Sequence, residues 1–293
     1  MGPSKSKHKF ITLFILLFSV SFSYGFTRTV EDKVINSLIQ KIEQKIRQYP
    51  QLVCGVYIKH IGAKNVKSTI SVNGNSAFPA ASLIKIPIAV VLLKKIDKGQ
   101  ISWDETLTLK TYHYAQGAGI LRTKKTGTKI KLKEVFRFML LISDNTATNM
   151  VIDLLGGVKA TNQEIAKLNL KNTRLNNWLG DFKGTNKTSP CDLVTILEES
   201  LEGQLLSSDS RKYFRSTLLK VKNKSLIKKG LGRYTKFAHK TGTIGICVGD
   251  AGIIYFPISK KIGISIIVKR PFNSLNGQKI IREISNLVYE HLG

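Results

Sequence analysis

The sequence predicts an α/β fold of the α+β type, in which one antiparallel sheet is built from both ends of the chain. The first observation is that Val-rich and Ile-rich runs, which are typical of strands, occur near the two ends. These runs are residues 52–60, 66–72, 235–243, 248–256 and 262–270. The second observation is that the segments between them are typical of helices. Because an isolated hairpin is barely stable in water, the strands from the two ends are expected to share one sheet.

Helices are expected to flank this sheet at both termini. Residues 29–48 carry apolar side chains at a helical period with charged residues between them, and Pro50 ends the pattern. The chain closes with a second set of apolar positions at helical spacing: Ile280, Ile284, Leu287, Val288 and Leu292. Turns are predicted at Gly62–Asn65 and at Pro257–Lys260, between the strands at each end.

The helical segments form one inserted lobe, so we expect a single domain that covers residues 26–293. Its sheet part takes in about 26–81 and 231–293, and the helical lobe takes in about 82–230. Loops are predicted within the lobe at 110–129, 156–162 and 176–190. The cleft between sheet and lobe is the natural place for a site.

The first 25 residues have the order of a secretory signal peptide. Lys5, Lys7 and Lys9 precede an apolar run from Phe10 to about Phe22, and small residues follow it. The run is shorter than the ~20 residues that span a bilayer, although an uncleaved anchor is an alternative. We therefore expect an exported protein, periplasmic or extracellular, without a stable membrane span. We also expect it to be a monomer.

The net charge and the cysteine content limit the classes of molecule that the chain is expected to bind. A formal charge of +27 suggests a polyanion, but 36 of the 46 basic residues are Lys and they are spread along the chain, which argues against a nucleic acid. Attraction to anionic cell-wall polymers stays open. The three cysteines, Cys54, Cys191 and Cys247, are too few for a disulfide scaffold, and their pairing is undetermined. We expect no metal and no cofactor, because no Cys or His cluster has ligand spacing.

Ser82 and Lys85 are the first residues that suggest chemistry. They stand three apart at the start of an apolar helix, so Lys85 can reach the Ser82 hydroxyl. A Ser at a helix N-terminus also lies where backbone N–H groups favour a developing anion. The same pattern occurs by chance elsewhere in this Lys-rich chain, and the alternative role for Ser82 is a helix N-cap.

Two further short motifs follow along the chain. Ser143–Asn145 ends one apolar helix and leads into another segment, where a simple turn is the alternative. Lys240–Gly242 lies on a strand near the C-terminus. A second Lys-Thr-Gly at Lys125–Gly127 falls in a polar loop and is interpreted as a turn.

Taken together, the three motifs resemble those of class A β-lactamases and penicillin-binding proteins in order and approximate spacing. Ser143 follows Ser82 by 61 residues and Lys240 follows Ser143 by 97. The likeness covers essentially the whole mature chain, and further matching segments are Leu154–Gly157, Arg174–Trp178 and Thr188–Pro190. The resemblance implies a β-lactamase/transpeptidase-like fold and a serine acyl-transfer enzyme.

The resemblance also implies roles for individual residues. Ser82 attacks an amide carbonyl, neutral Lys85 accepts its proton, and Ser143 passes a proton to the leaving nitrogen. The backbone N–H groups of Ser82 and Thr243 form an oxyanion hole. The substrate-binding residues are Asn145 for its amide, Lys240 and Thr241 for its carboxylate, and the adjoining Gly242 and Thr243.

The sequence departs from β-lactamases where they activate the water that releases the acyl group. Those enzymes carry a Glu after the Trp of the Arg-Leu-X-X-Trp segment, and Leu179 stands there in this chain. The following loop is shorter, and Asn177 and Asn186 replace its usual charged pair. Its only carboxylate is Asp181, either a substitute base or a solvated loop residue.

Two more departures bear on function. Gly117–Leu121 is more similar to DD-peptidases that share the class A fold. Ala251 stands near the place of a carboxylate-binding Arg, for which Arg270 is either a substitute or a surface charge.

The sequence therefore favours a penicillin-binding DD-peptidase that acts on D-Ala-D-Ala cell-wall peptides and is acylated at Ser82 by β-lactams. The alternative is a divergent class A β-lactamase that hydrolyses β-lactam antibiotics. A minor alternative is a non-catalytic peptidoglycan-binding protein.

Overall fold

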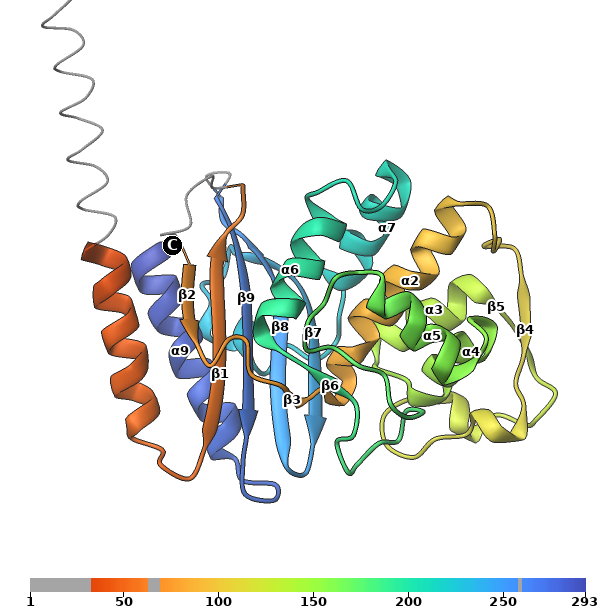
Figure 1. The fold of residues 1–293 in the computed structure, drawn as a ribbon, viewed down its shortest axis with the longest axis horizontal. Coiled ribbons are helices and arrows are strands. Elements are labelled where there is room, and N and C mark those ends of the chain that lie inside the picture. Colours follow the sequence, from red (N-terminus) through yellow and green to blue (C-terminus); the bar gives the residue numbers. More distant parts are fainter. Residues whose placement is uncertain (1–32, 63–68, 258–259) are drawn as a thin grey trace, which may run out of the picture.

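A computed structural model describes residues 33–62, 69–257 and 260–293, and in it both ends of the chain meet in one sheet (Figure 1). The strands are β1 (Val53–His60), β2 (Thr69–Val72), β7 (Lys236–Ile244), β8 (Cys247–Tyr255) and β9 (Lys261–Lys269). They are antiparallel in the order β2-β1-β9-β8-β7, and β1 pairs with β9 from Val53 opposite Lys269 to His60 opposite Ile262. The predicted shared sheet is confirmed.

Helices cover both faces of the sheet. The helical residues 33–47 and α9 (Asn276–Leu292) lie side by side on one face (Figure 1), where Leu38 and Ile284 share a buried cluster with Ile264 of β9. On the other face α6 (Pro190–Leu201) packs on β8 and β9. Hydrophobic burial on both faces explains why the central strands are apolar almost throughout rather than alternating.

The inserted lobe contains α2 (Lys85–Asp97), α3 (Leu132–Leu141), α4 (Asn145–Leu154), α5 (Gly157–Ala166) and α7 (Ser208–Leu218). The short helix α8 (Ile227–Gly230) instead packs against α9 beside the sheet. Short 3₁₀ turns lie at η2 (Ala81–Ile84), η3 (Thr111–His113) and η4 (Leu121–Thr123). Two small ribbons pair β3 (Phe78–Pro79) with β6 (Lys187–Thr188), and β4 (Thr106–Thr108) with β5 (Lys129–Lys131). The first part of α2 is buried on all sides, which is why its sequence is continuously apolar rather than amphipathic.

One predicted loop is wrong. Residues 156–162 were expected to be irregular, but α5 begins at Gly157. Gly156 and Gly157 have φ of 94° and 87°, values that favour glycine, so the chain reverses within two residues and the next helix starts at once.

Some expectations lie outside the described residues: the signal peptide at 1–25, the start of the first helix, and parts of the two predicted turns. Within the described part of the chain, no helix is long and apolar enough to cross a membrane.

Candidate active site

Ser82 lies in the turn η2, between the sheet and the helical lobe. Its neighbours Leu83 and Ile84 are buried, whereas Ser82 is half-exposed and its side chain caps no helix. Ala81 just before it has a φ of 45°, an uncommon value for a residue with a Cβ. The Ala80 N–H donates to the Asn186 carbonyl at 2.8 Å, so the turn is tied to a distant loop.

Lys85 begins α2 and points at Ser82, as the spacing of three residues predicts. Its Nζ is fully buried and lies 3.1 Å from Ser82 Oγ and 3.1 Å from Ser143 Oγ. It also donates to the Ser143 carbonyl at 2.6 Å and to Asn145 Oδ1 at 2.7 Å. Because these two oxygens only accept, they occupy both hydrogens of a neutral amine. The lone pair of a neutral Lys85 is then left facing the two hydroxyls.

The charge state of Lys85 follows from its surroundings. Burial lowers the pKa of Lys85 well below its usual value, and the positive charge of Lys240 lowers it further, while Asp144 opposes both. The site therefore favours a lysine that can accept a proton.

Ser143 connects the two lysines. It lies between α3 and α4 with a φ of 60°, and its Oγ accepts from Lys240 Nζ at 3.0 Å as well as contacting Lys85. Asp144, the next residue, caps α4 through the N–H of Ala147 at 2.8 Å. The strained backbone at Ser143 is held in place because the next residue, Asp144, is fixed by its hydrogen bond to the start of α4.

Asp144 also fixes the loop in front of the site. Its Oδ2 accepts from the N–H groups of Ile120 and Leu121 at 2.7 and 2.9 Å. A Cβ at Gly119 would lie 2.2 Å from the Asp144 carboxyl carbon, so this approach requires glycine. The segment Gly117–Leu121 singled out in the sequence thus packs directly against the Ser143 motif.

Lys240 lies on β7, the edge strand that packs against η2. It is fully buried, and its Nζ donates to Ser143 Oγ and, at 2.7 Å, to the Thr241 carbonyl. Burial lowers the pKa of Lys240 to about 7, against an opposing effect from the Asp250 carboxylate. An anionic group arriving beside Lys240 would raise its pKa again and restore the ammonium.

A buried pair beside Lys240 was missed by the sequence analysis. His239 Nδ1 lies 2.9 Å from Asp250 Oδ1, and the Ile227 N–H donates to Asp250 Oδ2 at 3.1 Å. Burial raises the pKa of Asp250, and the neighbouring His239 opposes the rise. The available signal was two polar residues inside otherwise apolar strands, since buried polar groups need partners.

The strand after Lys240 faces the nucleophile. A Cβ at Gly242 would lie 3.1 Å from the Ser82 backbone N and 3.0 Å from the Leu83 backbone N. Thr241 is buried, and Thr243 is exposed. The backbone of β7 at Gly242 therefore approaches the turn that carries Ser82 so closely that only a residue without a side chain fits there.

Asn145 starts α4 with both ends of its amide engaged. Oδ1 accepts from Lys85, and Nδ2 donates to the Gln116 carbonyl at 2.8 Å. The second Nδ2 hydrogen is left for a substrate carbonyl. Ser82, Lys85, Ser143, Asn145 and Lys240 are thus brought together by the fold.

The loop opposite, residues 176–186, is held by amide groups. Asn186 Oδ1 accepts from the N–H groups of Asn176 and Asn177 at 2.8 and 2.9 Å, and its Nδ2 donates to the Asn177 carbonyl at 3.1 Å. Asp181 accepts from Thr185 Oγ1 at 2.9 Å and from the Asn186 N–H at 2.7 Å. Both carboxylate oxygens of Asp181 are therefore occupied within the loop.

Leu179 is buried, and its main chain is bonded on both sides to Asn149 of α4. Its N–H donates to Asn149 Oδ1 at 2.8 Å, and its carbonyl accepts from Asn149 Nδ2 at 3.3 Å. The side chain belongs to the core of the helical lobe. No carboxylate of the described residues hydrogen-bonds to Ser82, Lys85, Ser143 or Lys240.

Arg270 is not brought to the Ser82 cluster by any hydrogen bond in the described part of the chain. It is buried just after β9, where it donates to the Ser274 carbonyl at 2.8 Å, to Gln278 Oε1 at 3.1 Å and to the Ile244 carbonyl at 3.1 Å. Ala251 is paired with Lys240 across β7 and β8 and is fully buried. Arg270 is thus engaged in supporting the end of β7.

The three cysteines are free thiols, and burial raises the pKa of Cys54 and of Cys247 to about 12. Among the residues that the structure describes, no group of three His, Cys, Asp or Glu side chains is placed to hold a metal ion.

Comparisons with known proteins find relatives along most of the chain. The model of the beta-lactamase enzyme family, Beta-lactamase2, matches residues 37–292. Beta-lactamase VEB-1 of Pseudomonas aeruginosa is 26% identical over 260 residues, which are 78% of this chain and 82% of that protein. A beta-lactamase of Bacteroides uniformis is 26% identical over 237 residues, or 74% and 80% of the two chains.

Solved structures extend the comparison to the fold. A Leu-to-Glu variant of PBP-A, an acyl-enzyme complex with penicillin G, aligns with a TM-score of 0.84 and 39% identity over 88% of this chain and 96% of that chain. TLA-1 extended-spectrum beta-lactamase aligns with a TM-score of 0.79 and 26% identity over 88% and 98%.

Proposed function

Because this chain belongs to the beta-lactamase enzyme family, we propose that it is a penicillin-binding DD-peptidase acting on D-Ala-D-Ala cell-wall peptides. Family membership makes it a class A β-lactamase-like serine hydrolase that acts on amide bonds. The finer assignment rests on one observation: a buried Leu179 stands where a carboxylate would have to activate water.

Acylation begins at Ser82. Its Oγ attacks the amide carbonyl and its proton passes to the neutral Lys85 Nζ, 3.1 Å away. The carbonyl oxygen becomes an oxyanion, which the backbone N–H groups of Ser82 and Thr243 stabilise. The close approach of β7 to the turn at Gly242 brings the backbone of the two segments together beside Ser82.

Ser143 carries the proton onward. Its Oγ bridges Lys85 and Lys240, so it donates a proton to the leaving nitrogen and regains one from Lys85. Lys240 and Thr241 hold the carboxylate of the substrate, and the ammonium of Lys240 is favoured once that anion is bound. Asn145 donates its second Nδ2 hydrogen to the substrate amide.

Release of the acyl group is the slow step for a β-lactam. A general base that is missing costs ~10²–10⁴ in rate. Leu179 has no proton acceptor in its side chain, and Asp181 has both oxygens bonded within its loop. The 39% identity to PBP-A, of which a Leu-to-Glu variant forms an acyl-enzyme with penicillin G, supports this assignment.

The test mixes purified protein with nitrocefin and follows turnover together with the mass of the intact protein. We expect one burst and a lasting adduct, absent in Ser82→Ala. A parallel assay should release D-Ala from a peptide ending in D-Ala-D-Ala. Many rapid turnovers of nitrocefin would refute the DD-peptidase assignment, and no adduct with no hydrolysis would instead support a peptidoglycan-binding protein.

A divergent class A β-lactamase is the second candidate, favoured by the curated relatives, which are beta-lactamases such as VEB-1. Asp181 would be its substitute base, after leaving its bonds to Thr185 and Asn186. The nitrocefin turnover number separates the two candidates directly.

We also propose that residues 1–25 direct export and are removed, which leaves a single catalytic domain at 26–293. Cell-wall peptides lie outside the cytoplasm, so this location agrees with the proposed substrate. Mass spectrometry of the protein from the secreting cell tests it, because retention of residues 1–25 would contradict it.

A further inference from the structure

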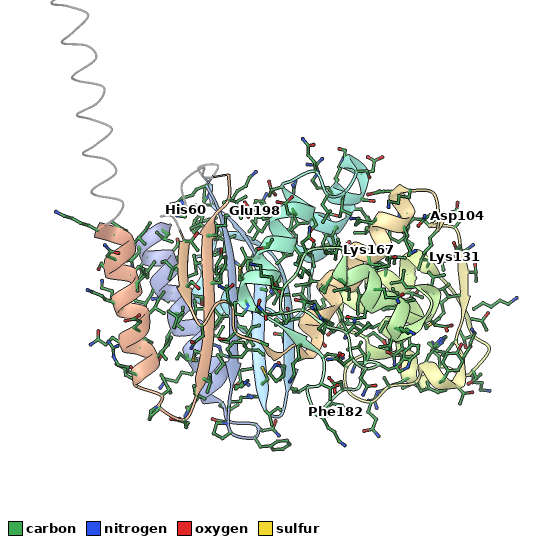
Figure 2. All side chains as sticks on the ribbon, in the orientation of Figure 1. His60, Asp104, Lys131, Lys167, Phe182 and Glu198 are labelled. Carbon is green, nitrogen blue, oxygen red and sulfur yellow. The ribbon has the colours of Figure 1, made fainter. Side chains whose placement is uncertain are left out.

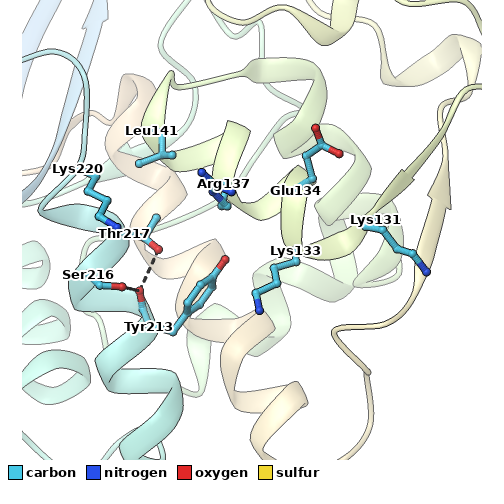
Figure 3. Close-up of a pocket in the computed structure, with 9 residues that line it drawn as sticks. All are labelled: Lys131, Lys133, Glu134, Arg137, Leu141, Tyr213, Ser216, Thr217 and Lys220. Atoms are coloured by element: carbon cyan, nitrogen blue, oxygen red, sulfur yellow. Dashed lines mark hydrogen bonds between the residues drawn. The ribbon is translucent and has the colours of Figure 1, made fainter.

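A second hollow lies in the helical lobe between α3 and α7 (Figure 3). It is a cavity of about 510 Å³, within the range of small-ligand pockets. None of the residues that line it belongs to the Ser82 cluster. Figure 2 shows how Lys131, at one end of the hollow, lies on the outer side of the lobe, far from Phe182 in the loop opposite Ser82.

The hollow gathers positive charge that has no carboxylate partner. Lys133 and Arg137 of α3 and Lys220 after α7 line it, and none of them forms an ion pair within the described residues. Three unpaired cations around one hollow leave a strong positive potential for an anion.

The one acid of the hollow does not cancel this charge. Glu134 also lines it, but its carboxylate points away from the centre (Figure 3). Lys131, at the same end, donates to the Asp104 carbonyl at 3.2 Å, so its hydrogen bonding is directed outward. The cations nearest the centre are therefore Lys133, Arg137 and Lys220.

Tyr213 provides a fixed donor at the centre. The centroid of its ring lies 5.1 Å from that of Trp103 and 5.7 Å from that of Phe136. Lys133 Nζ lies 5.5 Å from the centroid of the Tyr213 ring. The hydroxyl is buried without a hydrogen-bond partner in the described residues, and Figure 3 shows it pointing into the space between Arg137 and Lys133. Burial raises the pKa of Tyr213, although Arg137 opposes the rise, so the phenol keeps its proton to donate.

The hollow also offers acceptors for hydroxyl groups. Ser216 and Thr217 each donate to the Tyr213 carbonyl at 2.9 Å, so their oxygens remain free to accept. A bare phosphate needs only donors, whereas a phosphorylated polyol brings its own hydroxyl hydrogens.

We propose that this hollow binds a small phosphorylated polyol or sugar. The phosphate lies among Arg137, Lys133 and Lys220 and accepts a hydrogen bond from the Tyr213 phenol. The hydroxyl groups of the ligand donate to Ser216 and Thr217. Arg137 can hold two phosphate oxygens at once, which a lysine cannot.

The test measures binding of glycerol 3-phosphate to the full-length protein by calorimetry at low and moderate salt. Inorganic phosphate tests binding of the phosphate group alone, and glycerol tests binding of the polyol alone. Arg137→Gln should weaken glycerol 3-phosphate about tenfold, the usual loss of one charge-assisted contact. Tyr213→Phe keeps the packed ring and should weaken binding about three- to tenfold.

Matched controls separate this site from the general positive charge. Lys98→Gln just after α2 and Lys212→Gln on α7 remove the same charge outside the hollow and should leave the affinity unchanged. Lys240→Gln should also leave it unchanged, because the candidate active site is elsewhere. Equal losses in these controls, a loss confined to Lys240→Gln, or no binding by the unmodified protein would overturn the proposal.

Two further binding experiments, with inorganic phosphate and with a poly(glycerol phosphate) oligomer, identify the chemical source of the ligand. Inorganic phosphate that binds as tightly as glycerol 3-phosphate would overturn the polyol part. A poly(glycerol phosphate) oligomer that competes more strongly than the monomer, and loses that advantage in Arg137→Gln, would identify a polymer as the source. Equal competition by monomer and oligomer would identify a free metabolite.

Discussion

Two regions beside Ser82, a first wall formed by the buried lysines and a second wall formed by the loop 176–186, are built in opposite ways. On one wall, Lys85 and Lys240 are fully buried, face no carboxylate at hydrogen-bonding distance, and meet at the hydroxyl of Ser143. On the other wall, the loop 176–186 is closed by amide-to-backbone bonds from Asn186, and its single carboxylate, Asp181, is bonded within the loop.

The difference separates two halves of a catalytic cycle. Buried, unpaired lysines are costly to the fold, and such a cost is typical of sites where a proton must be transferred. In the loop 176–186, the carboxylate of Asp181 and the amide of Asn186 form their hydrogen bonds within the loop, so neither is free to act as a base. Under the proposed function, the first wall serves attack by Ser82, and the second provides no general base for release of the acyl group.

The largest effect should come from removing the base on the first wall. Lys85→Arg keeps a positive charge but cannot accept a proton, so acylation by a fluorescent penicillin should slow by ~10²–10⁴. Lys94→Arg, farther along the same helix, is the control and should acylate normally. A Lys85→Arg rate within tenfold of the unmodified protein would show that another group is the base.

The second prediction adds a base to the second wall. Leu179→Glu should speed hydrolysis of the penicillin adduct by less than the ~10²–10⁴ that a well-placed general base brings, because Asn149 fixes its backbone and the side chain begins in the apolar core. Leu179→Gln is the matched control without a carboxylate. The lifetime of the adduct by mass spectrometry measures the effect, and turnover as fast as in a β-lactamase would show that the loop already has the required geometry.

The third prediction concerns pH. The ammonium of Lys240 is present below its pKa of about 7 and is lost as pH rises through that value. The second-order rate of acylation by an anionic penicillin should therefore fall above pH 7, approaching about tenfold per pH unit. A penicillin whose carboxylate is esterified is the control and should show a flatter alkaline limb. Equal slopes of acylation rate against pH for the two compounds would mean that Lys240 does not bind the carboxylate.

The fourth prediction tests how the second wall is held. Asn186→Ala removes the three hydrogen bonds of a buried side chain and should lower the free energy of unfolding by about 1–3 kcal/mol. Asn176→Ala removes one bond from an exposed amide, to the Thr185 carbonyl, and should cost less. Chemical denaturation measures both, and equal costs would argue that the Asn186 side chain is not what closes the loop.

The smallest effect is expected at Asp181. Asp181→Asn should change the lifetime of the penicillin adduct far less than the ~10²-fold expected for loss of a general base. A large increase in lifetime would instead identify Asp181 as the base of a divergent β-lactamase and reverse the interpretation of the second wall.

The sequence alone was sufficient for the fold class and for the contact between Ser82 and Lys85. Both depend on short-range physics: strand composition at the two ends, and a spacing of three residues that brings side chains to one face of a helical turn. The order of the motifs indicated Ser143 and Lys240 only through a family resemblance. Ser143 lies 61 positions after Ser82, and Lys240 lies 97 positions after Ser143, so no local interaction along the chain connects them.

Tertiary structure decided what those residues do together. It put Ser143 Oγ between two buried lysines, engaged both oxygens of Asp181, paired His239 with Asp250, and opened the hollow around Tyr213. Each depends on which elements pack against one another and how much water they exclude. Periodicity along a chain specifies the elements, but burial and hydrogen-bond partners across the fold determine charge and reactivity.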